Sequence, residues 1–268
     1  MQPVANLGSR LKRIGDNKMK RYKGVYAFKT DIGRVRISNE DQALVLTNSL
    51  GEVLLAVCDG MGGQNKGDCA SKLAIGYLRD AFLEKKTSFS SFLNRRWLAR
   101  AIKGANALVF KEANSNPRYK DMGTTMVAVL LSGDKMYLGN VGDSRCYSLY
   151  NGKLNLLSED QTYVDYLYRT GKISKEATAS REDRHVLMNA LGVFPSASFD
   201  LKVSMYNGES ILLCSDGLYN NLPDIEIRAI MSTNDSPSEK VDSFINEANG
   251  NGGSDNIAVA YWEALNND

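Results

Sequence analysis

Apolar residues along this chain fall into short unbroken runs separated by turn residues, a pattern typical of buried strands. The first paired runs are 43–47 with 53–57 and 125–131 with 136–141. Ser49-Leu50-Gly51 and Ser132-Gly133-Asp134 separate the members of each pair, and Asn151-Gly152, which favours a type I′ turn, predicts a third hairpin. Connections this short join antiparallel neighbours, so the pattern predicts antiparallel sheets.

Other segments carry the spacing of helices that bury one face. They are 70–81, 98–109 and 241–248, and the last of them lies between two further apolar runs at 211–214 and 257–262. Residues 159–195 are more polar and irregular, and we interpret them as short helices that form a flap between strands. Hairpins with helices in separate blocks, rather than a regular alternation of strand and helix, predict an α+β layered domain.

Composition and charge describe an ordinary globular protein. The chain has 268 residues, of which 43% are hydrophobic, enough for a sizeable core. Lys and Arg number 33 against 31 Asp and Glu, a balance that does not argue for nucleic acid or an acidic membrane as the main partner. Seven basic residues lie between Arg10 and Lys23, so we predict a basic lead-in at 1–23 before a domain at 24–265 with its flap at about 159–195.

No apolar stretch approaches the roughly 20 residues that span a bilayer, and the N-terminus lacks the apolar core of a secretory signal. We therefore expect a cytoplasmic protein without a transmembrane segment. The four cysteines lie far apart without a Cys-x-x-Cys pair, which favours reduced side chains over disulfides or zinc. No exposed heptad or dimer stripe is evident, which favours a monomer.

Acidic residues stand at the ends of the apolar runs. Asp59 and Asp216 each follow a run, Asp255 precedes one, and Glu40 and Asp41 precede the first. Burying a bare carboxylate is costly unless it is paired or bound to a cation. Oxygen ligands without a histidine or cysteine cluster favour Mg²⁺ or Mn²⁺ over zinc. A single Asp-Gly is first of all a turn signal, so it is the ordered set that predicts a metal centre.

The ordered set resembles the metal-dependent protein phosphatases of type 2C, the PPM family, and specifically their compact bacterial members. The matching segments are Thr30-Asp31-Ile32-Gly33-Arg34-Val35-Arg36 with Asn39-Glu40-Asp41, Val57-Cys58-Asp59-Gly60-Met61-Gly62-Gly63, Met122-Gly123-Thr124-Thr125, Asn140-Val141-Gly142-Asp143-Ser144-Arg145, Leu213-Cys214-Ser215-Asp216-Gly217-Leu218 and Gly253-Ser254-Asp255-Asn256. They follow the family's order over about residues 24–262. The resemblance implies a four-layer αββα sandwich of two antiparallel sheets flanked by helix pairs, with a flap insertion near the active site.

The resemblance also implies a centre of two Mn²⁺ or Mg²⁺ ions. Asp59 looks like the carboxylate that bridges them, and Asp216 and Asp255 look like further ligands of the first ion. Glu40 and the carbonyl of Gly60 look like ligands of the second.

Three further residues complete this interpretation. Asp41 would act mainly through bound water, and Asp143, together with Asp216, resembles the pair that holds a looser third ion. Arg36 resembles the arginine that grips phosphate oxygens, a task that its planar guanidinium suits. Two ions of this kind can present a bridging hydroxide to phosphorus. We therefore expect hydrolysis of phosphoserine and phosphothreonine on proteins, without a covalent enzyme intermediate.

One position departs from the family pattern. Some members have a histidine just after the first Asp-Gly, proposed to protonate the leaving group, whereas this chain has Met61. We expect metal-bound water to take that role. The only histidine, His185, lies in the predicted flap, where we expect an ordinary structural or surface role.

Other phosphatase classes lack their required residues here. A cysteine-dependent enzyme needs Arg six residues after its Cys, but Gln64, Ile75, Gly152 and Asn220 occupy those offsets. The alternatives that remain are a catalytically weak pseudophosphatase that binds or regulates phosphoproteins, and an enzyme for small phosphate esters. A missing metal ligand usually marks the first, and every expected ligand position is filled. The family also implies a cognate serine/threonine kinase as a partner.

Overall fold

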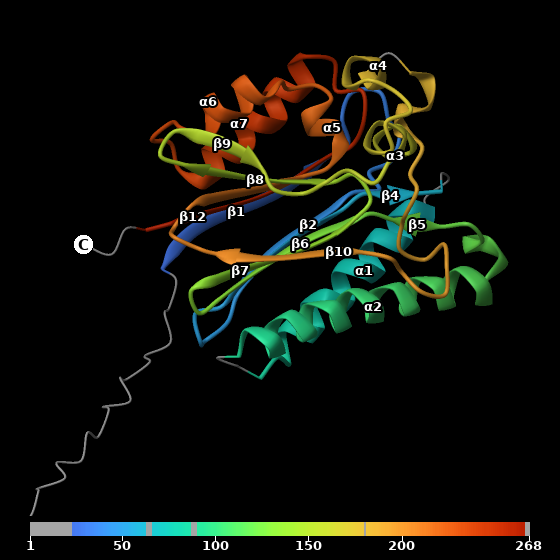
Figure 1. Ribbon diagram of the computed structural model, residues 1–268, viewed down its shortest axis with the longest axis horizontal. Helices are drawn as coiled ribbons and strands as arrows, with labels where there is room; N and C mark the ends of the chain where they lie inside the picture. The colour runs from blue at the N-terminus through green and yellow to red at the C-terminus, as the bar shows by residue number, and fades with distance from the viewer. Residues whose placement is uncertain (1–22, 63–65, 87–89, 180, 266–268) are drawn as a thin grey trace, which may run out of the picture.

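The computed structural model describes residues 23–62, 66–86, 90–179 and 181–265, so most of the predicted basic lead-in lies outside the described residues. Two five-stranded antiparallel sheets lie face to face at its centre (Figure 1). The first sheet contains, in order, β1 (Gly24–Asp31), β12 (Ile257–Ala264), β11 (Ser210–Cys214), β8 (Arg145–Tyr150) and β9 (Lys153–Leu156). The second contains β10 (Asp200–Met205), β7 (Lys135–Val141), β6 (Met126–Ser132), β3 (Val53–Cys58) and β2 (Gln42–Thr47).

Helices cover the outer face of each sheet, which confirms the predicted four-layer α+β sandwich. The second sheet is covered by α1 (Lys66–Leu83) and α2 (Ser91–Ser115), and the first by α5 (Asp216–Tyr219), α6 (Asp224–Met231) and α7 (Pro237–Gly250) (Figure 1). Between β9 and β10 lie α3 (Tyr163–Arg169), α4 (Lys175–Ala179) and the 3₁₀ turn η2 (Glu182–His185). These short helices form the predicted flap, at the end of the sandwich where α5 begins.

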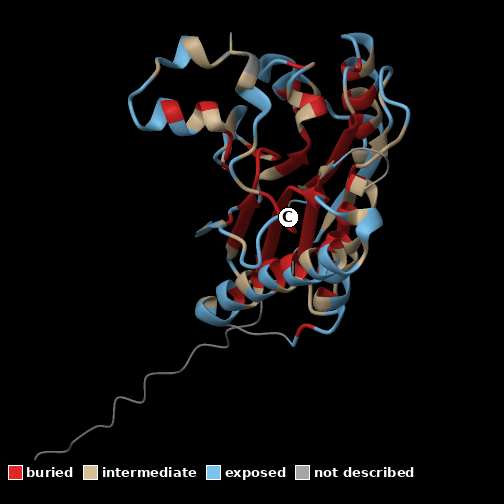
Figure 2. Cartoon of the chain, turned by 90° about the vertical axis from the view of Figure 1, so that its right-hand side faces the viewer, coloured by how far each residue is buried: buried red, intermediate tan, exposed pale blue. Residues whose placement is uncertain are grey.

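The core explains the unbroken apolar runs. Side chains such as Leu55, Leu213 and Trp262 fill the space between the sheets, while Leu54 and Leu212 face the helix layers. Figure 2 shows the buried strands at the centre and the exposed outer sides of the helices. Because the central strands are covered on both faces, they need apolar residues at every position, and the usual alternation disappears.

The local predictions hold where the pattern was strong and fail at the sheet edges. Asn151 and Gly152 have φ values of +49° and +74°, which confirms the type I′ turn between β8 and β9. Two edge strands, β1 and β10, were not predicted from the pattern. Much of each strand is exposed, so neither shows an apolar run. Their positions follow from pairing with β12 and β7 instead.

All four cysteines lie in the described part of the chain and are free thiols, as predicted. Within the same residues, no helix combines the length and the apolar character needed to cross a bilayer.

A buried ion pair joins the end of α1 to the β2–β3 turn. Nζ of Lys85 lies 2.6 Å from Oε1 of Glu52, and both side chains are only 1% exposed. Ser132 donates its hydroxyl to the same oxygen at 2.6 Å, and Asn48 Nδ2 donates to Oε2 of Glu52 at 2.8 Å. The pair therefore ties a helix to two strands without contact with solvent.

Candidate active site

Strand pairing brings the acidic residues of the first half of the chain together. Gln42, the first residue of β2, pairs with Cys58, the last residue of β3. Glu40 and Asp41 just before β2 therefore lie beside Asp59 just after β3. The antiparallel register alone creates this proximity, because it aligns the start of one strand with the end of its neighbour.

The same principle gathers the acids of the other sheet. Cys214 at the end of β11 pairs with Val259 of β12 on one side and with Arg145 at the start of β8 on the other. Asp216 follows β11, Asp255 precedes β12 and Asp143 precedes β8. All three acids therefore lie at the same end of the sheet, where these strand ends meet.

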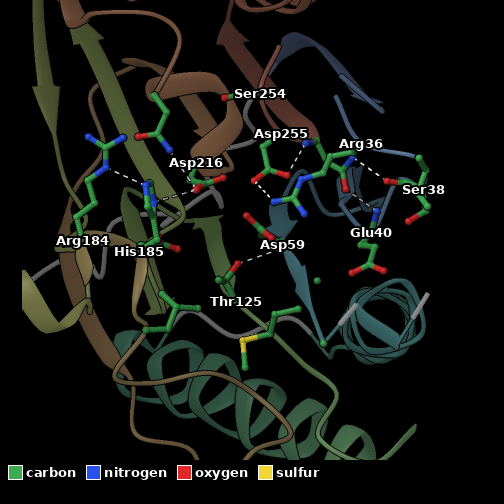
Figure 3. Close-up of a pocket in the computed structure, with 18 residues that line it drawn as sticks. Arg36, Ser38, Glu40, Asp59, Thr125, Arg184, His185, Asp216, Ser254 and Asp255 are labelled. Atoms are coloured by element: carbon green, nitrogen blue, oxygen red, sulfur yellow. Dashed lines mark hydrogen bonds and ion pairs between the residues drawn. The ribbon is translucent and has the colours of Figure 1, made fainter. Parts of the chain in front are cut away.

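The strand ends of the two sheets enclose a cleft of about 880 Å³, shown in Figure 3. Among its lining residues are Arg36, Glu40, Asp59, Gly60, Asp143, Asp216 and Asp255. The structure thus brings together seven of the eight residues predicted for the site. The eighth, Asp41, is 1% exposed and lies outside the lining; its Oδ2 is buried without a hydrogen-bond partner among the described residues.

Two threonines fix the backbone of Asp59. Its N–H donates to Oγ1 of Thr125 at 3.0 Å, and its carbonyl accepts from Thr125 N–H and from Oγ1 of Thr124, both at 2.8 Å. Oγ1 of Thr125 also lies 2.7 Å from Oγ of Ser144, the residue after Asp143. The Gly-Thr-Thr motif, for which we predicted no role, therefore links the two halves of the site.

Asn256 holds the loop that carries Arg36 and Glu40. Its Nδ2 donates to the carbonyls of Ile32 and Ser38, each at 2.9 Å, while its Oδ1 accepts from the N–H of Glu40 at 2.9 Å. One amide thus ties three points of the β1–β2 loop to the start of β12. The sequence singled out Asn256 only as part of the Ser-Asp-Asn motif.

Glycines allow the first turn of α1 to approach Gly60 and Glu40. A Cβ on Gly60 would lie 2.3 Å from the carbonyl oxygen of Gly67, and a Cβ on Gly67 would lie 2.3 Å from Oε2 of Glu40. Both approaches are shorter than any side chain permits. Residue 67 must therefore be a glycine for α1 to approach the Gly60 carbonyl, and this requirement was not predicted from the sequence.

Arg36 reaches into the cleft from the β1–β2 loop. Its Nη2 donates to Oδ2 of Asp255 at 2.7 Å, and the Arg36 side chain remains 56% exposed (Figure 3). The hydrogen bond to Asp255 raises the pKa of the guanidinium, with smaller contributions from the charges of Asp216 and Asp59. The Arg36 guanidinium thus faces several carboxylates of the cleft.

The carboxylates oppose one another's ionisation. Burial raises the pKa of Asp41 to about 8, and burial with the charge of Asp216 raises the pKa of Asp143 to about 7. Burial and the neighbouring charge of Asp255 raise the pKa of Asp216 to about 6. For Asp59, burial and the charge of Asp41 raise the pKa well above its usual range. The carboxylates of the cluster outnumber the cations, Arg36 and Arg184, that line the same cleft.

Divalent cations fit this donor set. The cluster offers carboxylate oxygens, the Gly60 carbonyl beside Glu40 and the unpartnered oxygen of Asp41, the hard ligands that Mg²⁺ and Mn²⁺ prefer. In the described part of the chain, no group of three or more His, Cys, Asp or Glu side chains is already arranged to hold an ion. Rotation of side chains would therefore have to complete the coordination.

The raised pKa values predict an unusual pH dependence of stability in excess chelator. The folded state holds protons on these carboxyls that the unfolded chain, with pKa values near 4, releases, so stability falls as pH rises from about 4 to 8. We expect a lower Tm at pH 8 than at pH 6 in EDTA, measured by calorimetry. Mn²⁺ should raise Tm more at pH 8, because metal binding needs deprotonated ligands. A Tm in EDTA that rises over this range, with Asp41→Asn leaving the slope unchanged, would contradict the prediction.

His185 lies in the cleft rather than on an unrelated surface. Its Nδ1 is 3.9 Å from Oδ2 of Asp216, and Arg184 Nε donates to its other ring nitrogen at 2.8 Å (Figure 3). Met61 also lines the cleft. The flap position was predicted correctly, but the ordinary role expected for His185 did not foresee its contact with Asp216, which depends on how the flap folds back.

The chain matches the sequence model of the family described as Protein phosphatase 2C over residues 33–249. The chain belongs to the protein phosphatase 2C family. The serine/threonine phosphatase stp of Listeria monocytogenes is 40% identical over 237 residues, which cover 88% of this chain and 94% of stp. The serine/threonine protein phosphatase PstP of Mycobacterium tuberculosis is 32% identical over 244 residues, which cover 91% of this chain and 45% of PstP. The chain is therefore a protein serine/threonine phosphatase.

Solved structures agree with this assignment. The serine/threonine phosphatase of S. agalactiae has a TM-score of 0.85 at 30% identity, with 91% of this chain and 100% of that chain covered. The catalytic domain of PstP in complex with two manganese ions has a TM-score of 0.76 at 30% identity, with 91% and 99% covered. Membership of the protein phosphatase 2C family supports metal-dependent catalysis and does not favour the pseudophosphatase alternative.

Proposed function

We propose that this protein phosphatase 2C enzyme removes phosphate from phosphoserine and phosphothreonine in proteins at a dinuclear Mn²⁺ or Mg²⁺ centre in the cleft. The observation that carries the proposal is the convergence of five acidic side chains, from both sheets, at one edge with too little positive charge to balance them. When bound, the ions supply an acidified water and positive charge for the phosphoryl oxygens.

The placement of each residue supports its proposed role. Asp59 stands between Glu40 on one side and Asp216 with Asp255 on the other, the position that a bridging ligand requires (Figure 3). Gly60, whose carbonyl is the proposed partner of Glu40, lines the same cleft. Thr124 and Thr125 form hydrogen bonds only with the backbone of Asp59, so they leave its carboxylate available for this role.

Two acids complete the proposed centre. Asp41 lies behind Asp59, where its unpartnered Oδ2 can accept a hydrogen bond from a bound water. Asp143 reaches the cleft beside Asp216, whose charge raises its pKa, and the two are the proposed ligands of a third, looser ion.

Arg36 is the proposed substrate-binding residue. Its exposed guanidinium can exchange the carboxylate of Asp255 for two oxygens of a phosphoryl group, which match its planar fork. Because a charge-assisted hydrogen bond of this kind contributes about 1.5–3 kcal/mol, we expect Arg36→Ala to lower kcat/KM for a phosphothreonine peptide about 10- to 100-fold. Steady-state kinetics would measure the change.

Arg34 provides a matched control in the same loop. It donates to the backbone carbonyl of Asn249 at 2.8 Å, and it is not among the residues that line the cleft. Arg34→Ala should therefore leave kcat/KM near the wild-type value once folding is confirmed. Equal losses in the two variants would show that disturbance of the loop, and not loss of phosphate binding by Arg36, lowers kcat/KM.

The experiment that tests the proposed function titrates Mn²⁺ and Mg²⁺ into chelator-treated enzyme with phosphoserine, phosphothreonine and phosphotyrosine peptides in parallel. We expect no hydrolysis in excess EDTA, recovery with either ion, and preference for phosphoserine and phosphothreonine. Full activity in EDTA would refute the metal mechanism. Hydrolysis of p-nitrophenyl phosphate without hydrolysis of any peptide would instead indicate an enzyme for small esters.

The proposed setting of this activity is the cytoplasm, with phosphorylated proteins as substrates and a serine/threonine kinase as the opposing enzyme. We further propose a monomer, since one chain supplies every predicted ligand. Sedimentation of the purified protein at micromolar concentration tests the monomer directly.

A further inference from the structure

The near-neutral charge of the whole chain conceals one strongly basic segment. From Lys85 to Lys111 the sequence contains seven Lys and Arg residues and no Asp or Glu. This segment begins two residues after the end of α1 and includes most of α2. Lys85 is buried with Glu52, but the other six cations are exposed; these are Lys86, Arg95, Arg96, Arg100, Lys103 and Lys111.

The cations of α2 and two large apolar residues at its start form what we call the α2 face. It comprises Phe92, Leu93, Arg95, Arg96, Arg100, Lys103 and Lys111. At 100° per residue, these positions fall within about 160° of one another. The opposite side of α2, which includes Leu98, Ile102 and Val109, is buried in the core against the second sheet. The cations of the α2 face are therefore in the solvent-exposed part of the helix surface.

Large apolar side chains are exposed where the α2 face begins. Phe92 is 66% exposed, Leu93 is 49% exposed, and Leu83 at the end of α1 is 64% exposed. They lie around the connection between the two helices, beside Lys86, Arg95 and Arg96. Exposed apolar residues bordered by cations are typical of a helix that lies at a bilayer surface.

Within the described residues, none of the six exposed cations takes part in an ion pair. Lys103 stacks over the ring of Phe199 at 5.9 Å, which does not neutralise its charge. Glu84 and Glu112 border the segment on either side, and Glu112 follows the last cation of the α2 face. The positive charge of this face is therefore available to an anionic partner.

The position of the face leaves the active site accessible. α1 starts at Lys66, next to Gly67 beside the carboxylates, and ends at Leu83, and its 18 residues span about 27 Å. α2 begins at the end of the sandwich away from the flap, the end where β1 also starts at Gly24 (Figure 1). In the sequence, the basic residues between 10 and 23 directly precede Gly24.

We propose that the α2 face binds the surface of a bilayer that contains anionic lipids, with Phe92 and Leu93 entering the interface and the arginines contacting headgroups. The charge of the face complements such a surface. The apolar residues disfavour a nucleic acid, which does not account for exposed Phe and Leu at the tip, and the arrangement of cations beside exposed apolar residues is that of a helix at an anionic bilayer surface. Bound in this way, the enzyme presents its cleft away from the lipid, toward phosphoproteins at the membrane.

Vesicle flotation of the full-length protein tests the proposal. The probes are phosphatidylcholine vesicles with and without 30% phosphatidylglycerol, at about physiological ionic strength. Under these conditions each cation close to the anionic surface contributes measurably to binding. The test variant is Arg95→Gln/Arg96→Gln/Arg100→Gln, and the charge-matched control is Lys153→Gln/Lys172→Gln/Lys175→Gln, whose three lysines are exposed on β9 and the flap. p-Nitrophenyl phosphate hydrolysis confirms that each variant is folded.

We expect the wild-type protein and the lysine control to float with the anionic vesicles, and the arginine variant to bind about 100-fold more weakly. Phe92→Trp should show a blue-shifted emission only with anionic vesicles. Failure of the wild-type protein to bind, equal losses in the two triple variants, or binding to RNA or polyglutamate but not to vesicles would each overturn the proposal. Hydrolysis is measured separately, so these outcomes are independent of the proposed metal mechanism.

Discussion

Asp59→Asn is expected to lower kcat for phosphothreonine peptides by at least about 1,000-fold at saturating Mn²⁺. An amide at this position cannot supply the anionic bridge on which the proposed centre depends, and loss of that electrostatic stabilisation is worth several kcal/mol in the transition state. The substitution keeps the shape of the side chain. It also keeps the hydrogen bonds from Thr124 and Thr125, which involve only the backbone of Asp59. Single-turnover kinetics with a phosphothreonine peptide would measure the loss.

The stability of the same variant distinguishes a chemical defect from misfolding. Because burial and the charges of Asp41, Asp216 and Asp143 all raise the pKa of Asp59, removing its charge relieves desolvation and repulsion in chelated protein. Asp59→Asn should therefore have a Tm in EDTA at least as high as that of the wild type, and a smaller rise in Tm on addition of Mn²⁺. Asp134→Asn, at an exposed hairpin turn, is the matched control and should change neither quantity. Retention of more than a tenth of wild-type kcat by Asp59→Asn would contradict the bridging role.

Lys85→Met should destabilise the fold by about 3–5 kcal/mol without a direct effect on the chemistry. The substitution leaves Glu52 with a buried charge, hydrogen-bonded to Ser132 and Asn48 but without its cation. The ion pair lies at the end of α1 away from the cleft, so the folded fraction should keep its kcat. Urea unfolding in the presence of Mn²⁺ would give the free energy of unfolding.

The double variant Glu52→Gln/Lys85→Met separates lost packing from unpaired charge. With the charge removed from both partners, we expect stability to recover by more than 1 kcal/mol relative to Lys85→Met alone. A double variant no more stable than Lys85→Met would show that the lysine side chain, whose Nζ lies 5.7 Å from the ring centroid of Trp97, contributes mainly through contacts other than the ion pair with Glu52.

Much of the fold could be predicted because its central strands are local features. Each is a run of apolar residues between turn signals, and burial on both faces keeps the run unbroken. The edge strands β1 and β10 lacked that signal, since much of each strand faces solvent. Short helices such as α5 were also missed, because its four residues are too few to show a helical period.

The candidate site could be predicted as a set of residues but not as a geometry. Acids at strand ends and their order identified the family, and seven of the eight predicted residues line the cleft. The supporting contacts of Thr125, Asn256 and Gly67 could not be predicted, because each joins segments far apart in the sequence. The contact between His185 and Asp216 and the burial of Lys85 with Glu52 could not be predicted for the same reason.

The sequence by itself determined the apolar runs, the hairpin at Asn151-Gly152 and the positions of the carboxylates, since these depend on local composition and backbone preference. Only the tertiary structure decided which strand ends meet. That outcome rests on antiparallel register across two sheets, a non-local choice, and it turns separate acids into one cluster of buried charge. Tertiary structure also placed the cations of α2 on a single exposed face, because packing of the opposite side against the sheet fixed which residues remain in solvent.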